Sequence, residues 1–343
     1  MSELTVSTEL LPEALVDSVE RIKSFLIDAE EGLADMAQLP EGEENEEFLE
    51  HILMLWTKVY RDFEKHAARL SPHLLSEGKN YVRQRLHPHL LRAPFVNRAY
   101  LKPRGYAGDY EMMNMLLKPE PMGNTVYEQV VHLLNVLPGI PESVRNRSDI
   151  MKDYLSVYHS DYAKEPVFRI LSVASGPAWE VERFLKTKPE RRIQITLVDH
   201  DEEALAYAGD RLNRVAAESG LEVEVVLIRE SVIKLLKDAR NQEFFFEEAH
   251  FHVAYSAGIM DYLSDNICTE LIHYLLRSLH RHGVFFTTNM HPQNTERYWM
   301  EYIFDWSLIY RDEEALRALS PVPANRVYAD ATGINVFLEV KPQ

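Results

Sequence analysis

Residues 171–180 read Leu171-Ser172-Val173-Ala174-Ser175-Gly176-Pro177-Ala178-Trp179-Glu180, an apolar run that passes through small residues into a helical pattern. The small residues Ala174, Gly176 and Ala178 let the backbone turn sharply and approach a ligand closely. The helix that follows has free backbone N–H groups at its N-terminus. The stretch predicts a strand, a ligand-binding turn and a helix, although a tight turn in another α/β protein explains the pattern about as well.

Outward from this turn, the chain after Pro166 alternates between short apolar runs and helical patterns. We expect strands at 167–174, 193–198, 223–228, 251–255 and 283–288, with helices at 180–186, 202–218, 232–236 and 266–280. Strands separated by helices predict a parallel sheet built from right-handed crossovers. The last two strands, 326–330 and 335–340, flank Ala331-Thr332-Gly333 and predict a β-hairpin.

The first part of the chain has a different pattern. Apolar residues recur at helical spacing over 10–38, 48–70 and onward to 86, then over 126–137 and 143–158, with an acidic loop at 40–47. We therefore expect two regions, an all-helical N-terminal cap over 1–160 and an α/β domain over 161–343. We also expect the cap to act as a lid over the carboxyl ends of the strands.

Composition narrows the possible partners. The chain has 343 residues, 54 acidic and 37 basic, a net charge of −17 and no Lys/Arg-rich run, so we expect a small-molecule substrate and no nucleic acid. The one cysteine, Cys268, is interpreted as a packing residue, and we expect no metal. Residues 1–13 lack the pattern of a secretory signal and no apolar run is long enough to span a membrane, so we expect a cytoplasmic protein without membrane insertion. Oligomeric state stays open.

The end of the second expected strand carries acidic residues. Asp199 and Asp201 flank His200 there. A carboxylate at this tip can accept both ribose hydroxyls of a nucleoside cofactor. The alternative is a helix N-cap, which Asp201 satisfies, so we assign Asp199 and His200 to the cofactor and Asp201 to the cap. A second Gly-rich phosphate loop is absent, which argues against a dinucleotide.

Two further turns follow the third and fourth strands. Ser231 and Val232 are candidates for contact with the adenine ring. Tyr255, Ser256 and Ala257 end the fourth strand at the topological switch point, where ligands bind, so we expect them beside the reacting group. An ordinary strand-to-helix turn is the alternative. Ala174, Ser175 and Gly176 complete the expected cofactor site.

An irregular segment at 98–110 interrupts the helical region. Its Arg104, Tyr106, Asp109 and Tyr110 are side chains that can grip a carboxylate or an amino acid moiety. A turn that joins two helices is an equally good explanation.

Several of these runs resemble the 3-hydroxypalmitic acid methyl ester synthases of bacterial quorum sensing, over roughly residues 94–340. The resemblance lies in Lys102-Pro103-Arg104-Gly105-Tyr106-Ala107-Gly108-Asp109-Tyr110, Val144-Arg145-Asn146-Arg147, 172–178, 255–263, 300–306, Leu308-Ile309-Tyr310-Arg311 and Thr332-Gly333-Ile334-Asn335. The chain departs at Ser175, where Cys is usual. It also has A-x-G-x-A for the G-x-G-x-G turn common in S-adenosylmethionine (SAM) enzymes, with Ser172 where an acidic residue often ends the strand.

The resemblance implies a Rossmann-like class I methyltransferase sheet, closed by the C-terminal hairpin, that uses SAM to methylate the carboxylate of a 3-hydroxy fatty acid. The product would be a diffusible signalling methyl ester. Arg147 and Asp109 join the expected cofactor-binding residues at the matching positions. The family fixes the cofactor more firmly than the acceptor, so a methyltransferase for another small metabolite stays an alternative.

A carboxylate acceptor is already ionised at neutral pH, so the site needs an anchor and not a base. Arg104, Arg147, Tyr310 and Arg311 could serve, whereas His291, His200 or Asp261 could be the base for a hydroxyl or amine acceptor. We take the catalytic residues to be Arg104, Tyr106, Asp261, Tyr310 and Arg311. The rival reaction is a SAM-consuming lyase or cyclase that forms a small-ring amino acid and methylthioadenosine; a non-enzymatic SAM sensor is a third reading.

Overall fold

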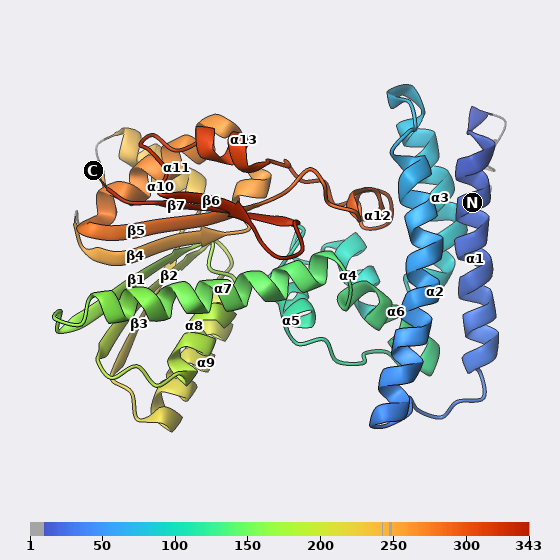
Figure 1. Ribbon diagram of the computed structural model, residues 1–343, viewed down its shortest axis with the longest axis horizontal. Coiled ribbons are helices and arrows are strands. Elements are labelled where there is room, and N and C mark those ends of the chain that lie inside the picture. Colours follow the sequence, from blue (N-terminus) through green and yellow to red (C-terminus); the bar gives the residue numbers. More distant parts are fainter. Residues whose placement is uncertain (1–9, 242, 247–248, 343) are drawn as a thin grey trace. The chain divides into compact units, whose positions relative to one another are not determined.

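The computed structural model describes residues 10–241, 243–246 and 249–342, and within them seven strands form one sheet (Figure 1). The strand order is β3-β2-β1-β4-β5-β7-β6. The strands are β1 (Val167–Val173), β2 (Arg192–Asp199), β3 (Val223–Arg229), β4 (Phe251–Ala257), β5 (Leu279–Met290), β6 (Arg326–Ala329) and β7 (Asn335–Val340). The first five are parallel, and β7 pairs antiparallel with both β5 and β6.

This order confirms the expected layout, a core of five parallel strands followed by a C-terminal antiparallel hairpin. The order reverses between β1 and β4, so a crevice for ligands is expected at the carboxyl ends of these two neighbours. Most of the N-terminal stretch considered for a secretory signal, residues 1–9, lies outside the described residues.

Helices cover both faces of the sheet. On one face lie α7 (Ile140–Asp161), α8 (Trp179–Lys186) and α9 (Glu202–Ser219), whose apolar side chains pack on Ile170 and Phe286. On the other lie α10 (Val232–Arg240), α11 (Asp265–Ser278) and α13 (Glu313–Ala318), which pack on Leu171 and Phe285. Because both faces are buried, the central strands consist of nearly continuous apolar runs.

The chain forms two compact units, one of residues 1–142 with 295–307 and one of 143–294 with 308–343. The second contains the sheet. The boundary expected at residue 160 marks the change from helix to strand, whereas packing divides the chain earlier, because Met151 and Leu155 of α7 belong to the core of the sheet.

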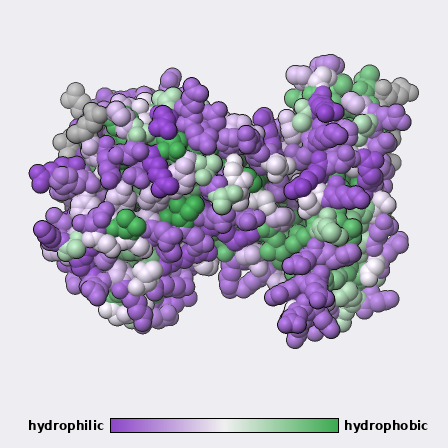
Figure 2. Space-filling model, in the orientation of Figure 1, coloured by the Kyte–Doolittle hydropathy of each residue, from purple (hydrophilic) through white to green (hydrophobic). Residues whose placement is uncertain are grey.

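The helical unit contains α1 (Glu13–Leu33), α2 (Glu43–Ala67), α3 (Leu75–Leu90), α4 (Pro94–Leu101), α5 (Tyr110–Leu117), α6 (Val126–Val136) and α12 (Arg297–Ile303). The acidic loop expected at 40–47 is shorter, since α2 begins at Glu43. The acidic residues in its first turn stabilise the helix, because their negative charge interacts favourably with the positive end of the helix dipole. The helix α12 joins this unit through Trp299, whose ring packs edge-on against Trp56 with centroids 5.1 Å apart. Figure 2 shows hydrophilic residues over most of the visible face.

Candidate functional site

The turn after β1 has an unusual backbone. Ala174, Gly176 and Ala178 have φ angles of 54°, 49° and 50°, which are left-handed. Each non-glycine residue in this region costs about 1–2 kcal/mol, and such strain concentrates at ligand sites. A Cβ added at Gly176 would meet no atom within 4 Å, so this side of the turn faces open space. The buried Ser175 hydroxyl has no hydrogen-bond partner among the described residues.

Asp199 ties this turn to the end of β2. Its Oδ2 accepts a hydrogen bond from the Gly176 amide at 2.9 Å, and its Oδ1 accepts from the Asp201 amide at 3.0 Å. The ring of His200 lies 3.1 Å from Oδ1, and this contact raises the pKa of His200. Asp201 caps α9 by accepting from the amides of Glu203 and Ala204. The predicted cap is thus present, and Oδ2 of Asp199 keeps a lone pair for a hydroxyl donor.

The expected adenine-contacting residues lie at the start of α10. The Ser231 hydroxyl accepts from the Lys234 amide at 3.2 Å and caps the helix. Val232 is almost fully buried and packs in the core on that face of the sheet. Adenine contact at these two positions stays a prediction.

At the end of β4, Tyr255 is buried and its hydroxyl donates to Glu180 Oε1 at 2.6 Å. Glu180 lies in the first turn of α8. Burial raises the pKa of this carboxyl, opposed by the Tyr255 hydrogen bond and by the positive charge of Arg147. Beside them, the Ser256 hydroxyl is buried without a hydrogen-bond partner among the described residues. Sequence reasoning did not select Glu180.

Arg147 projects from α7 to the residue after β4. A Cβ added at Gly258, where φ is +88°, would lie 3.0 Å from Nη1 of Arg147, so this glycine makes room for the guanidinium. Burial lowers the pKa of Arg147, opposed by the negative charges of Asp261 and Glu180. The structure therefore brings Arg147 together with two carboxyl groups at the carboxyl end of β4.

Asp261 lies in the short 3-10 turn Met260–Tyr262 that follows. Its Oδ1 accepts from the Met290 amide at 2.6 Å, and its backbone carbonyl accepts from the Ile309 amide at 2.8 Å. Burial raises the pKa of Asp261 to about 7, against the effects of the Met290 amide and two nearby arginines. Asp261 thus joins the ends of β4 and β5 to the segment that contains Ile309.

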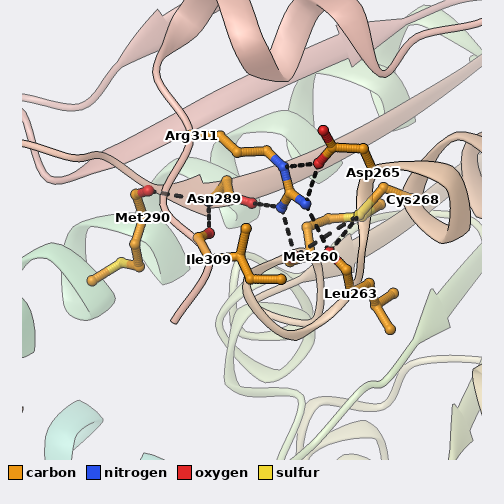
Figure 3. Close-up of polar contacts among 8 residues, drawn as sticks. All are labelled: Met260, Leu263, Asp265, Cys268, Asn289, Met290, Ile309 and Arg311. Carbon is orange, nitrogen blue, oxygen red and sulfur yellow. Dashed lines mark hydrogen bonds and ion pairs between the residues drawn. The ribbon is translucent and has the colours of Figure 1, made fainter. Parts of the chain in front are cut away.

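The guanidinium of Arg311 is engaged in hydrogen bonds within the protein (Figure 3). Its Nε and Nη2 donate to Asp265 Oδ1, its Nη1 donates to the Met260 carbonyl and to Asn289 Oδ1, and its Nη2 also donates to the Leu263 carbonyl. These bonds engage all five N–H donors of a side chain that is 3% exposed. These contacts favour a structural role for Arg311, and its role as an anchor for a substrate anion stays a prediction.

The neighbouring Tyr310 is partly buried, and its hydroxyl accepts from the Asn294 amide group at 3.4 Å. Cys268 is buried near Met260 and Leu263, and burial raises its pKa to about 11, as suits a packing residue (Figure 3). The described part of the chain holds no group of three or more His, Cys, Asp or Glu placed to hold a metal ion. No described helix is long and apolar enough to cross a membrane.

Arg104, Tyr106 and Asp109 belong to the helical unit. Asp109 is buried, accepts from the Met112 amide at 3.0 Å as the cap of α5, and pairs with Arg98 at 2.9 Å. The Arg104 guanidinium lies over the Tyr110 ring, 5.0 Å from its centroid. These contacts support the reading of 98–110 as a turn between two helices. Contact of Arg104, Tyr106 and Asp109 with a cofactor stays a prediction.

No family model matches the chain, and a comparison with curated proteins gives no match. Solved structures do match. A possible exported protein from Bordetella parapertussis aligns over 96% of this chain and 95% of its own, with a TM-score of 0.52 and 16% identity. At this identity, the likeness concerns the fold.

Two further solved structures align over shorter parts of the chain. Magnesium protoporphyrin IX methyltransferase from Synechocystis PCC 6803, with bound SAM, aligns over 60% of this chain and 84% of its own, with a TM-score of 0.41 and 8% identity. The N-methyltransferase NodS from Bradyrhizobium japonicum WM9, in complex with S-adenosylhomocysteine, aligns over 68% and 97%, with a TM-score of 0.42 and 11% identity.

Proposed function

We propose that this protein is a SAM-dependent methyltransferase. The observation that carries the proposal is the bond from the Gly176 amide to Asp199, which fixes a carboxylate beside an open, left-handed turn at the switch point of the sheet. The residues fit SAM: Asp199 can accept from the ribose hydroxyls, the open side of Gly176 admits close approach, and the unpartnered Ser175 and Ser256 hydroxyls can meet polar groups of a ligand.

When bound, SAM supplies a methyl group that is activated by its sulfonium. The task of the protein is to orient donor and acceptor in line and to exclude water. Ser256 and Ala257 end β4 beside the switch point, where their small side chains leave room for the reacting atoms. Asp261 holds this edge by its bond to Met290, so we assign it to positioning the site.

For the acceptor, we propose the carboxylate of a 3-hydroxy fatty acid, as the family resemblance implies. A carboxylate needs no general base, and one oxygen of the Asp261 carboxyl already accepts a hydrogen bond from the Met290 amide. With Arg311 engaged in the fold and Arg147 expected to bind the cofactor, Arg104 and Tyr310 are the remaining anchor candidates. The pKa of about 7 at Asp261 favours one alternative, a hydroxyl or amine acceptor with Asp261 as base.

Calorimetry with SAM and S-adenosylhomocysteine tests the cofactor. Gly176→Ala is expected to weaken binding by about tenfold or more, because its methyl group fills the open side of the turn. Gly220→Ala is the matched control, since Gly220 also has a positive φ and open surroundings but caps α9. Equal affinities in wild type and both variants would reject the proposed site.

The nucleoside product tests the reaction. Incubation with methyl-labelled SAM and an acyl acceptor is expected to release S-adenosylhomocysteine. Release of methylthioadenosine would instead identify the lyase or cyclase reaction, in which the amino group of SAM attacks its own Cγ.

A further inference from the structure

A carboxylate, a phenol and a guanidinium meet at the carboxyl ends of β1 and β4. Tyr255 donates to Glu180 at 2.6 Å, and the charge of Arg147 acts on both Glu180 and Asp261. Tyr255 is held in the sheet core, while Glu180 and Arg147 are only partly buried.

The first strand lacks the acidic residue that often ends it, because Ser172 takes that position. Ser172 pairs directly with Tyr255 across β1 and β4. Since Tyr255 holds the carboxylate of Glu180, the fold brings an acidic group back to this edge from the helix that follows the turn.

We propose that Glu180 and Arg147 together recognise the amino acid end of SAM, with Glu180 binding its α-ammonium group and Arg147 its α-carboxylate. Tyr255 is the positioning residue that orients Glu180. This inference rests on the proposed function and assigns two charged residues to one part of the cofactor.

Charge and packing support this assignment. A zwitterion presents one positive and one negative group, and the site offers the complementary pair on two different elements, α8 and α7. A cation bound beside Glu180 would oppose the effect of burial on its pKa and favour the ionised carboxylate. Gly258 leaves the space that Arg147 occupies, since a Cβ there would crowd Nη1 of the guanidinium at 3.0 Å.

Ligands that lack one charged group separate this role from a structural one. Methylthioadenosine has the nucleoside and sulfur but no amino acid, and decarboxylated SAM lacks only the carboxylate. Calorimetry would measure S-adenosylhomocysteine and methylthioadenosine with wild type and Glu180→Gln. The variant is expected to bind S-adenosylhomocysteine about tenfold more weakly and methylthioadenosine within about twofold of wild type.

Arg147→Gln is expected to weaken SAM by about tenfold while it leaves decarboxylated SAM nearly unchanged. Arg214→Gln is the control, because Arg214 is exposed on α9, a helix on the same face of the sheet. Tyr255→Phe removes one hydroxyl without altering the ring and should show the Glu180→Gln pattern more weakly. It serves as the second variant where Glu180→Gln reduces folding.

The pattern across ligands decides the result. A loss that is equal for S-adenosylhomocysteine and methylthioadenosine, or no loss for either, in Glu180→Gln and Tyr255→Phe would overturn the role of Glu180. Likewise, a loss that is equal for SAM and decarboxylated SAM in Arg147→Gln, or no loss for either, would overturn the role of Arg147. A wild-type protein that binds none of these nucleosides would overturn the proposed function itself, and the inference with it.

Discussion

The Asp199 carboxylate accepts a hydrogen bond from the Gly176 amide, so one side chain at the end of β2 holds the turn that follows β1. Asp199→Ala removes both this bond and the proposed ribose acceptor. We expect SAM binding to weaken by about 1.5–3 kcal/mol, as for other hydrogen bonds to charged groups. Calorimetry on the folded variant measures the loss.

Asp201→Ala is the control for this prediction. Asp201 accepts from Glu203 and Ala204 as the cap of α9, so its loss is expected to cost about 1 kcal/mol of stability. SAM affinity should stay close to wild type. If the two variants lost equal affinity, or Asp199→Ala lost none, Asp199 would be removed from the cofactor site.

Arg311→Lys tests the structural role of Arg311. A lysine has a single ammonium group and cannot reach Asp265, Asn289 and the Met260 carbonyl together. The buried acceptors then lose their donors, and we expect the free energy of unfolding to fall by about 3 kcal/mol or more. Chemical denaturation measures this change, with the exposed Arg317→Lys as control. A fully stable Arg311→Lys protein with impaired substrate binding would restore the anchor role.

The buried carboxyl of Glu64 leads us to expect that the stability of the helical unit depends on pH. Its carboxyl is buried on α2 and accepts from the amides of Tyr298 and Trp299 at the start of α12. Burial raises its pKa from an ordinary value of 4.5 to about 8. At pH values between 4.5 and about 8, Glu64 is ionised in the unfolded chain but keeps its proton in the folded chain. The free energy of unfolding is therefore greatest below the lower value and falls as pH rises toward about 8.

Glu64→Gln removes this titration. Denaturation at pH values between 5 and 8 should show a fall on the order of a few kcal/mol in wild type and a flatter profile in the variant. Burial also raises the pKa of Glu296, to about 7. Its titration lowers the free energy of unfolding over the same pH range, and this contribution remains in Glu64→Gln. Glu50→Gln, at an exposed site on the same helix, should leave the wild-type profile unchanged. Parallel profiles for Glu64→Gln and wild type would contradict the prediction.

Local patterns predicted the fold because its signals lie close together in the chain. Short apolar runs predicted the strands, and the small residues at 174–178 predicted the sharp turn after the first of them. The bond between the Gly176 amide and Asp199 was found only in the structure. The packing of 295–307 with the helical unit could not be predicted, since nothing near Trp299 shows that its ring contacts Trp56.

The candidate site was predicted only in part for the same reason. Glu180 looked like an ordinary acidic residue in a first helical turn, and its partner Tyr255 lies 75 residues away. Arg311 was selected for its charge, but the acceptors that engage it come from β5 and from the turn after β4. Sequence reasoning finds which residue types are present, whereas tertiary contacts decide which charges are left for a ligand.

The acyl chain of the proposed acceptor gives a final prediction. Each buried CH₂ contributes about 0.8 kcal/mol, so removal of two methylenes from the tail is expected to weaken acceptor binding by roughly tenfold. Purified protein would be incubated with labelled SAM and 3-hydroxy acids of graded length, with an amine and a phenol in parallel. The apparent KM should rise steeply as the chain shortens, while the affinity for SAM, measured separately, stays constant. Rates that ignore chain length, or label that reaches only the amine or the phenol, would contradict the fatty-acid acceptor. Either result would leave the assignment of SAM to Asp199 and Gly176 standing, because that assignment depends on the turn after β1 and not on the acceptor.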